Sequence, residues 1–292
     1  MELFVDILLS GVAQGMVFAA IALGLGIVSR ATGIVNFAQG AMGMFTTFIA
    51  FSLLSHGVGY WPAFVAALAL GAVLGAAVER TLIRPLQGKP ALNPVIVTIG
   101  LLIVLEGVAG SIWGNVARGF PAAFSQRGLV IGRTRVAFSH FDVFLVCAVV
   151  VLVVAIVALF RWTNLGLRMR AAAFSPEVSR LLGVRVGRLF TLAWALACAA
   201  GSLAGLLVAP LSSFSPYYMD LNLVYGFTAA VLGGLLSPVG ALVGGLVTGL
   251  AIAFVGGYVG PDLQPIAALA LLLLVLMVRP QGLFGTTEVR RV

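Results

Sequence analysis

The sequence predicts an all-α integral membrane protein, a polytopic bundle of helices that cross the bilayer eight or nine times. Of its 292 residues, 61% are hydrophobic and only 9% are charged, and the mean hydropathy is +1.15. Soluble domains carry about 25% charged residues, so the few charges here could not cover the surface of a soluble fold. The segments 143–160 and 267–278 carry no charge, and a spanning helix needs about 20 mainly apolar residues.

Eight apolar runs predict full spans, and a ninth predicts a shorter helix. The ninth run, 223–236, is too brief to cross a bilayer comfortably. It fits either a tilted short span or a half-helix buried among its neighbours. The eight spans are expected at 5–27, 36–55, 61–79, 95–113, 141–160, 190–210, 239–256 and 264–279. We expect residues 1–292 to form a single transmembrane domain, because no linker or soluble domain interrupts these runs.

The distribution of basic residues predicts the orientation. Cytoplasmic loops carry an excess of Lys and Arg, and segment 161–189 holds six arginines against one acid, Glu177. The other basic groups expected inside are Arg80, Arg84, Lys89, Arg290 and Arg291. The C-terminus is therefore expected in the cytoplasm, and the N-terminus outside, provided that 223–236 crosses. The net charge of +8 follows from the same rule and does not indicate a nucleic-acid partner.

Segment 114–140 is then expected outside, although it carries four arginines. Two short stretches, 128–132 and 136–138, are joined by Arg133-Thr-Arg135 and are typical of a hairpin. A folded external loop tolerates such charges, so the segment is compatible with the orientation.

Glycines four residues apart recur along the chain. In lipid, small residues allow two helix backbones to approach closely. We expect these pairs to serve tight packing within one bundle rather than a dedicated dimer face. The pairs are Gly11/Gly15, Gly71/Gly75, Gly201/Gly205, Gly240/Gly244 and Gly245/Gly249.

Two glycine-rich segments are candidates for a solute pathway. Segment 29–43 places Asn36 and Gln39 beside glycines at the entry to an apolar span. Segment 232–245, late in the chain, is likewise a glycine-rich segment at the entry to an apolar span. Transporters often break helices at matching places in two halves, with the solute path between them. Gly and Pro are also common in ordinary membrane helices, so composition alone leaves both interpretations open.

Glu106 is an acid within an otherwise apolar run. A charge at the bilayer centre costs about 3 kcal/mol or more, so such a group usually faces protein or water. It lines the pathway or pairs with an arginine, or else it forms an interhelical hydrogen bond near the external end in its protonated form. The sequence does not separate these alternatives.

The basic segment 161–189 contains signals for a short capped helix. Ser175 is a favourable N-cap, Pro176 suits the first helical position, and Glu177 complements the helix dipole. Gly183 supplies the stop. A helix of about two turns needs a surface on which to dock, and either a partner protein or the membrane surface would serve.

Catalytic motifs are missing from the sequence. Gly88-Lys89 lacks the glycine spacing of a phosphate loop, and the two histidines, His56 and His140, lie at span ends and form no cluster. We therefore expect a protein that is not an enzyme and that carries no cofactor or metal of its own.

Four motifs resemble the branched-chain amino acid ABC transporter permeases of the LivH type. The resemblance extends over nearly the whole chain, and the motifs occur in order at suitable spacing. They are Gly33-Ile-Val-Asn-Phe-Ala-Gln-Gly40, Leu165-Gly-Leu-Arg-Met-Arg-Ala171 with Leu181-Leu-Gly-Val184, Phe227-Thr-Ala-Ala-Val-Leu-Gly-Gly234 followed by Gly240 and Gly244-Gly245, and Arg279-Pro-Gln-Gly-Leu-Phe-Gly285.

The resemblance implies a multi-pass importer permease of the bacterial cytoplasmic (inner) membrane. Its partners would be a second homologous permease, two cytoplasmic ATPase subunits that hold ATP and Mg, and a periplasmic or lipid-anchored binding protein. Segment 161–189 would be the coupling loop, whose short helix docks on an ATPase. The residues implied for coupling are Gly166, Arg168, Arg170, Ala171, Ser175, Glu177, Leu181, Leu182 and Gly183. The residues expected along the translocation pathway are Asn36, Phe37, Gln39, Glu106 and Thr228.

The solute is not fixed by the sequence. The resembled family also includes permeases for urea, amides and aromatic acids, and Glu106 stands where the family more often has an uncharged amide. An ion-coupled secondary carrier is the alternative function, and it would need intramembrane acids for coupling. Besides Glu106, only Asp6 and Asp220 near span ends are available.

Overall fold

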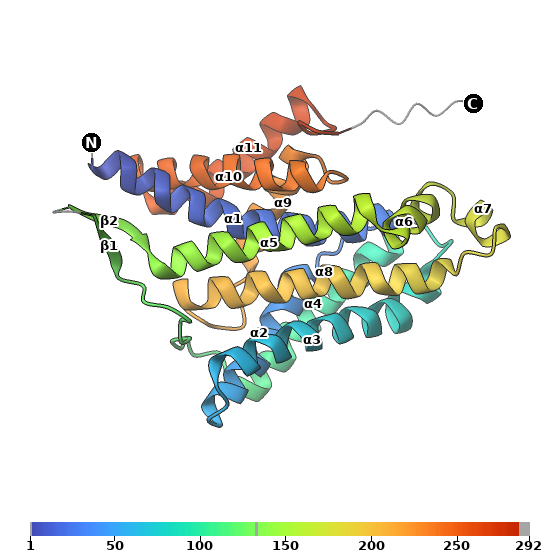
Figure 1. Ribbon diagram of the computed structural model, residues 1–292, viewed down its shortest axis with the longest axis horizontal. Helices are drawn as coiled ribbons and strands as arrows, with labels where there is room; N and C mark the ends of the chain where they lie inside the picture. The colour runs from blue at the N-terminus through green and yellow to red at the C-terminus, as the bar shows by residue number, and fades with distance from the viewer. Residues whose placement is uncertain (1, 91, 132–133, 286–292) are drawn as a thin grey trace. The chain divides into compact units, whose positions relative to one another are not determined.

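The computed structural model describes residues 2–90, 92–131 and 134–285 and consists mainly of helices (Figure 1). In chain order the elements are α1 (Glu2–Thr32), α2 (Gln39–Ser55), α3 (Tyr60–Val78), a π-helical turn (Glu79–Ile83), a 3-10 turn (Arg84–Leu86), α4 (Leu92–Trp113), β1 (Gly128–Ile131), β2 (Thr134–Ser139), α5 (His140–Trp162), α6 (Asn164–Phe174), α7 (Pro176–Leu181), α8 (Val186–Val208), a 3-10 turn (Ala209–Leu211), α9 (Asp220–Gly233), α10 (Pro238–Tyr258), a 3-10 turn (Pro261–Leu263) and α11 (Gln264–Val278). Arg133 of the expected hairpin and the basic residues Arg290 and Arg291 lie outside the described residues.

The prediction of an all-α polytopic membrane protein is confirmed. Among the described residues, seven helical stretches are long and apolar enough to cross a membrane. They are Leu3–Thr32, Tyr60–Leu86, Leu92–Trp113, His140–Trp162, Val186–Leu211, Pro238–Tyr258 and Pro261–Val278. Two further helices are shorter, α2 with 17 residues and α9 with 14.

The first helix is longer than the apolar run suggested. It continues to Thr32, where the prediction ended near residue 27, because no breaker occurs before Gly33, which has a φ of +70°. Arg30 in the last turn is compatible with the negative end of the helix dipole. The next helix begins only at Gln39, so residues 33–38 form a non-helical segment between two apolar helices.

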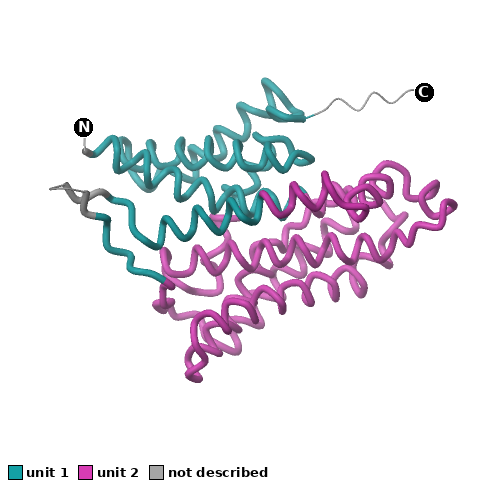
Figure 2. The backbone as a smooth tube through the Cα atoms, in the orientation of Figure 1, with its two compact units in different colours: residues 1–26, 124–153, 224–292 teal, residues 27–123, 154–223 magenta. Residues whose placement is uncertain are grey.

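One compact unit comprises residues 1–26, 124–153 and 224–292 (teal in Figure 2). Its helices pack through glycines: a Cβ at Gly15 would lie 2.8 Å from the carbonyl oxygen of Gly245, and a Cβ at Gly226 would overlap Ile21. The predicted hairpin is confirmed, with Gly128 opposite Ser139 across β1 and β2. Asp6 of α1 accepts a hydrogen bond of 2.9 Å from the backbone N–H of Ala137.

The other compact unit comprises residues 27–123 and 154–223 (magenta in Figure 2). In it, α8 packs against α2 and α3, with Gly43 and Gly201 in backbone contact and Gly71 against Ser202. Its largest fully buried side chain is Trp194 of α8. The glycine pairs thus serve tight packing within the chain, as predicted. A single domain over the whole chain stays a prediction.

The helices of this second unit differ in how much protein covers them. In the most apolar window of Val186–Leu211, 78% of the residues are buried, whereas in Leu92–Trp113 only 17% are. A helix that is apolar yet uncovered within the chain fits contact with lipid or with another subunit. α8 is therefore a central packing element, and α4 is peripheral.

Candidate translocation and coupling sites

The non-helical segment before α2 is organised by Asn36. Its side chain is 1% exposed, its Oδ1 accepts a hydrogen bond of 3.0 Å from the N–H of Ala38, and its Nδ2 donates to Oε1 of Gln39 over 3.1 Å. An Asn that bonds the backbone two residues ahead forms a local turn. The segment is thus a turn fixed by its own side chain, from which α2 starts.

Gln39 attaches the start of α2 to α8. Its Nε2 donates a hydrogen bond of 2.7 Å to the carbonyl oxygen of Ala197, in the interior of α8. Gly201 makes room for the amide, since a Cβ there would lie 2.7 Å from Nε2 of Gln39. Irregular backbone at membrane depth is tolerated only where protein or a water-filled cavity covers it. Here α8 covers the start of α2 through the contact with Gln39.

Further along the same pair of helices, hydroxyl groups form a second polar contact that sequence reasoning missed. Thr46 donates a hydrogen bond of 2.8 Å to Oγ of Ser202, which in turn bonds the carbonyl oxygen of Cys198 over 2.9 Å. Both hydroxyl-bearing residues are at most 1% exposed. The sequence signal for this contact was the presence of hydroxyl residues among the small residues of both helices. The search for glycines four residues apart did not detect it.

The remaining pathway candidates are distributed between the two units. Phe37 is half-buried and lies in the unit that contains Asn36 and Gln39. Thr228 lies on α9 in the other unit, fully buried, with its hydroxyl bonded to the carbonyl oxygen of Val224 over 3.0 Å. The structure therefore brings Asn36 and Gln39 together by hydrogen bonding, and the pathway role of all these residues stays a prediction.

Glu106 of α4 has a carboxyl partner rather than an arginine. Its side chain is half-buried and forms a side-chain hydrogen bond with Asp220, at the start of α9. A carboxylate only accepts hydrogen bonds, so two carboxyl groups can bond each other only when one of them carries a proton. Of the alternatives left open by the sequence, the structure places Glu106 beside an acid of another helix, and its role in a pathway stays a prediction.

The expected coupling loop folds into two capped helices, of which the first was not predicted. α6 begins after Thr163, whose Oγ1 accepts a hydrogen bond of 3.1 Å from the N–H of Gly166. A Cβ at Gly166 would overlap the backbone of Leu159 and Phe160, so glycine is needed where α6 turns back on the end of α5. The hydroxyl cap was the overlooked signal.

α7 agrees with the prediction at both ends. Ser175 caps it by accepting from the N–H of Val178 over 3.4 Å, and Pro176 is its first residue. Gly183 has a φ of +80°, a conformation that favours glycine.

The same region presents side chains that none of the described residues covers. Leu181 and Leu182 are 88% and 78% exposed, and Phe174 at the end of α6 is 90% exposed. The charged and small side chains expected for coupling are also exposed, namely Arg168, Arg170, Ala171 and Glu177. Ser179, by contrast, is buried. Segment 161–189 therefore presents exposed apolar side chains together with exposed charged ones.

A cavity of about 640 Å³ lies between α7 and the turn that follows α3. Glu177 and Arg180 line it from α7, and residues 86–89 line it from the turn. Among the residues that the structure describes, no cluster of His, Cys, Asp and Glu could hold a metal ion. The cofactors expected in partner subunits stay a prediction.

Comparison with known proteins identifies relatives over the whole length. The profile of a family described as "Branched-chain amino acid transport system / permease component" matches residues 7–278. The high-affinity branched-chain amino acid transport system permease LivH of Escherichia coli K12 is 30% identical over 99% of this chain and 98% of its own. The corresponding permease BraD of Pseudomonas aeruginosa is 30% identical over 98% and 97%.

A solved structure adds a similarity of fold. PsaBC of Streptococcus pneumoniae, solved in complex with a Fab, superimposes with a TM-score of 0.51 at 14% identity, covering 97% of this chain and 94% of that one. Identity this low shows a shared fold alone. The chain is thus a multi-pass membrane protein with relatives that match it from end to end.

Proposed function

Because this chain belongs to the family of branched-chain amino acid transport permeases, we propose that it forms half of the solute path of an ATP-driven importer. A second, homologous permease supplies the other half, and two separate cytoplasmic ATPase subunits hold ATP and Mg. The observation that carries the ATPase part of the proposal is the exposed apolar surface of α7.

The surface of α7 is better suited to a protein groove than to water. Leu181 and Leu182 expose most of their side chains, and burying a leucine contributes about 1.5–3 kcal/mol. A helix of six residues is not stable by itself, yet its Ser175 cap and Gly183 stop fix its ends. A small rigid helix of this kind loses little conformational entropy on docking.

We propose nine crossings, with the N-terminus outside and the C-terminus in the cytoplasm. The seven long apolar stretches, together with the shorter α2 and α9, give an odd number. The six arginines of segment 161–189 support its cytoplasmic position. Short helices can cross where neighbouring protein satisfies the backbone at their ends, as Asn36 does for the N–H of Ala38 before α2.

The proposed solute is a branched-chain amino acid or a related small amphipathic molecule, delivered by a periplasmic or lipid-anchored binding protein. The similarity to LivH and BraD, which are permeases of branched-chain amino acid transport systems, supports this choice. Asn36, Phe37, Gln39, Glu106 and Thr228 are proposed to lie along the path, which belongs to the cytoplasmic membrane of a bacterium. In such a path weak interactions suffice, because conduction requires that the solute leave readily.

The test is co-purification of the chain with its ATPase subunits, followed by ATP-dependent leucine uptake in proteoliposomes that contain the binding protein. Leu182→Asp places a charge on the apolar surface of α7, and we expect it to abolish ATPase association while the permease still inserts. Val116→Asp is the matched control, since Val116 is 74% exposed in the expected external loop. Full uptake by the Leu182→Asp variant would refute the role of α7.

The hydrogen-bonded pair of Glu106 and Asp220 is the observation that favours the second candidate, a proton-coupled secondary carrier. Intramembrane acids that exchange a proton serve ion coupling in many carriers. Leucine accumulation by the purified chain in liposomes with a proton gradient, without ATPases or ATP, would decide for the carrier. Accumulation only with ATPases and ATP would decide for the importer.

A further inference from the structure

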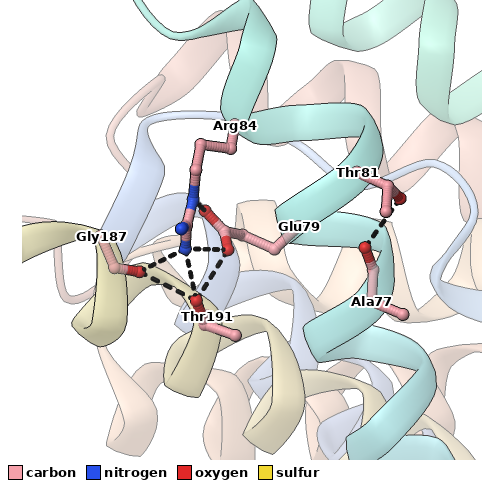
Figure 3. Close-up of polar contacts among 6 residues, drawn as sticks. All are labelled: Ala77, Glu79, Thr81, Arg84, Gly187 and Thr191. Carbon is pink, nitrogen blue, oxygen red and sulfur yellow. Dashed lines mark hydrogen bonds and ion pairs between the residues drawn. The ribbon is translucent and has the colours of Figure 1, made fainter.

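A fully buried carboxylate lies at the end of α3, outside the sites described above. Glu79 begins the π-helical turn and is 0% exposed. Its two oxygens bond the guanidinium of Arg84, with Nε 3.2 Å from Oε1 and Nη2 2.8 Å from Oε2 (Figure 3). Among the residues that the structure describes, this is the one ion pair with nitrogen and oxygen within 4.0 Å.

The same guanidinium reaches the first turn of α8. Nη2 of Arg84 donates to the carbonyl oxygen of Gly187 over 2.8 Å and to Oγ1 of Thr191 over 2.6 Å. The hydroxyl of Thr191 also lies 2.8 Å from Oε2 of Glu79 (Figure 3). The ion pair is therefore closed into a ring that joins the end of α3 to the start of α8.

The π-helical backbone of Glu79–Ile83 contributes to this ring. The N–H of Arg84 bonds the carbonyl oxygen of Glu79, five residues earlier, which is the π-helical pattern. In a regular α-helix the carbonyl oxygen of Glu79 would be bonded by residue 83 instead. π-helical turns often occur at functional sites, and this one holds the two charged residues together through both backbone and side chains.

α7 is joined to this ring through α8. Four residues separate Leu181, the last residue of α7, from Val186, the first of α8, and both α6 and α7 contact α8. The turn that contains Ile83 and Leu86 faces α7 across the cavity of about 640 Å³. α8 and the ring therefore provide a packed connection from α7 to α3 on one side of that cavity.

We propose that Glu79, Arg84 and Thr191 are positioning residues that transmit movement of α7 to the packed helices α3 and α8. The inference rests on the proposed function, because α7 moves in this way only when an ATPase grips it. Glu79 is fully buried, and the side chain of Arg84 is 35% exposed. Such an ion pair adds little stability over apolar residues of the same size, yet its hydrogen bonds fix one geometry. That fixed geometry makes α3 follow α8 instead of sliding along it.

The test measures leucine transported per ATP hydrolysed by the reconstituted complex. Thr191→Val removes the bridging hydroxyl at nearly constant size, and we expect it to lower this ratio about fivefold or more, with ATPase association unchanged. Thr191→Ser keeps the hydroxyl and should restore the ratio. Thr81→Val is the matched control, because the exposed hydroxyl of Thr81 bonds only the carbonyl oxygen of Ala77, one turn earlier (Figure 3).

The outcomes separate this inference from the proposed function. A wild-type chain that fails to bind ATPases would contradict the proposed function, whereas an unchanged ratio in Thr191→Val within an intact complex would overturn the inference alone. If Thr191→Val lowers the yield of folded complex, Arg84→Lys provides a second measurement. A lysine keeps the charge but lacks the planar fork that reaches Glu79 and Gly187 together, so the ratio should fall here too.

Discussion

Two helix pairs in this protein both pack through glycines, but they differ in the polar contacts between their side chains. α1 and α10 approach through Gly15 and Gly245, and within the described residues no side-chain hydrogen bond or ion pair joins them. α3 and α8 also approach closely, through Gly71 and Gly75, but a polar ring closes their ends. Close backbone packing resists separation, whereas directional polar contacts also resist sliding.

This difference indicates which helix pair has its register, the axial position of one helix against the other, fixed by polar contacts. Glycine surfaces are smooth, and their association in lipid depends on van der Waals contact over the whole face. The ring of Glu79, Arg84 and Thr191, whose carboxylate is buried, depends on a few atoms at defined distances. We therefore expect the two pairs to respond differently to substitutions that remove polar groups and similarly to substitutions that add volume.

The largest loss of stability is expected when only one partner of the ion pair between Glu79 and Arg84 is removed. Arg84→Met leaves the buried carboxylate of Glu79 without its cation, and an uncompensated buried charge costs about 3–5 kcal/mol. The thermal unfolding midpoint in detergent should fall accordingly. The double variant Glu79→Met with Arg84→Met should recover most of this loss, because an apolar pair replaces the ion pair. A double variant as unstable as Arg84→Met would contradict this account.

Added volume should destabilise both pairs to a similar, smaller extent. A Cβ at Gly15 would lie 2.8 Å from the Gly245 carbonyl oxygen, and one at Gly75 would overlap the Trp194 carbonyl oxygen. We expect Gly15→Val and Gly75→Val each to cost about 1–3 kcal/mol, measured by the same thermal unfolding. Gly107→Ala on α4 is the control, because nothing lies within 4 Å of its Cβ position. Two unaffected valine variants would exclude close packing at these glycines.

The smallest effect is expected at the hydroxyl contact of α2 with α8. Ser202→Ala removes the 2.8 Å hydrogen bond from Thr46, and such contacts in membrane proteins contribute about 0.6 kcal/mol on average. The double-mutant cycle with Thr46→Val measures this coupling without the loss of packing. A coupling energy as large as that between Glu79 and Arg84 would contradict the expectation that the ion pair contributes more than the hydroxyl contact.

Segment 161–189 shows which local features the sequence predicts and which it does not. Ser175, Pro176 and Gly183 predicted α7 because caps and stops act on their own neighbours in the chain. α6 was missed although Thr163 caps it in the same way, since the segment has no long apolar run. The pathway roles of Asn36 and Gln39 remain predictions, and their amides are seen to hold the start of α2.

The sequence by itself determined the membrane character, most of the spans, the hairpin and the capped α7, because hydropathy and local turn chemistry depend on neighbouring residues. Only the tertiary structure decided that Glu106 bonds Asp220 and that Glu79 and Arg84 reach Thr191, which lies 112 residues after Glu79. Partner choice over such separations depends on how helices pack. That packing brings distant residues together, and between α3 and α8 the hydrogen bonds of Glu79, Arg84 and Thr191 join the two helices at defined atoms.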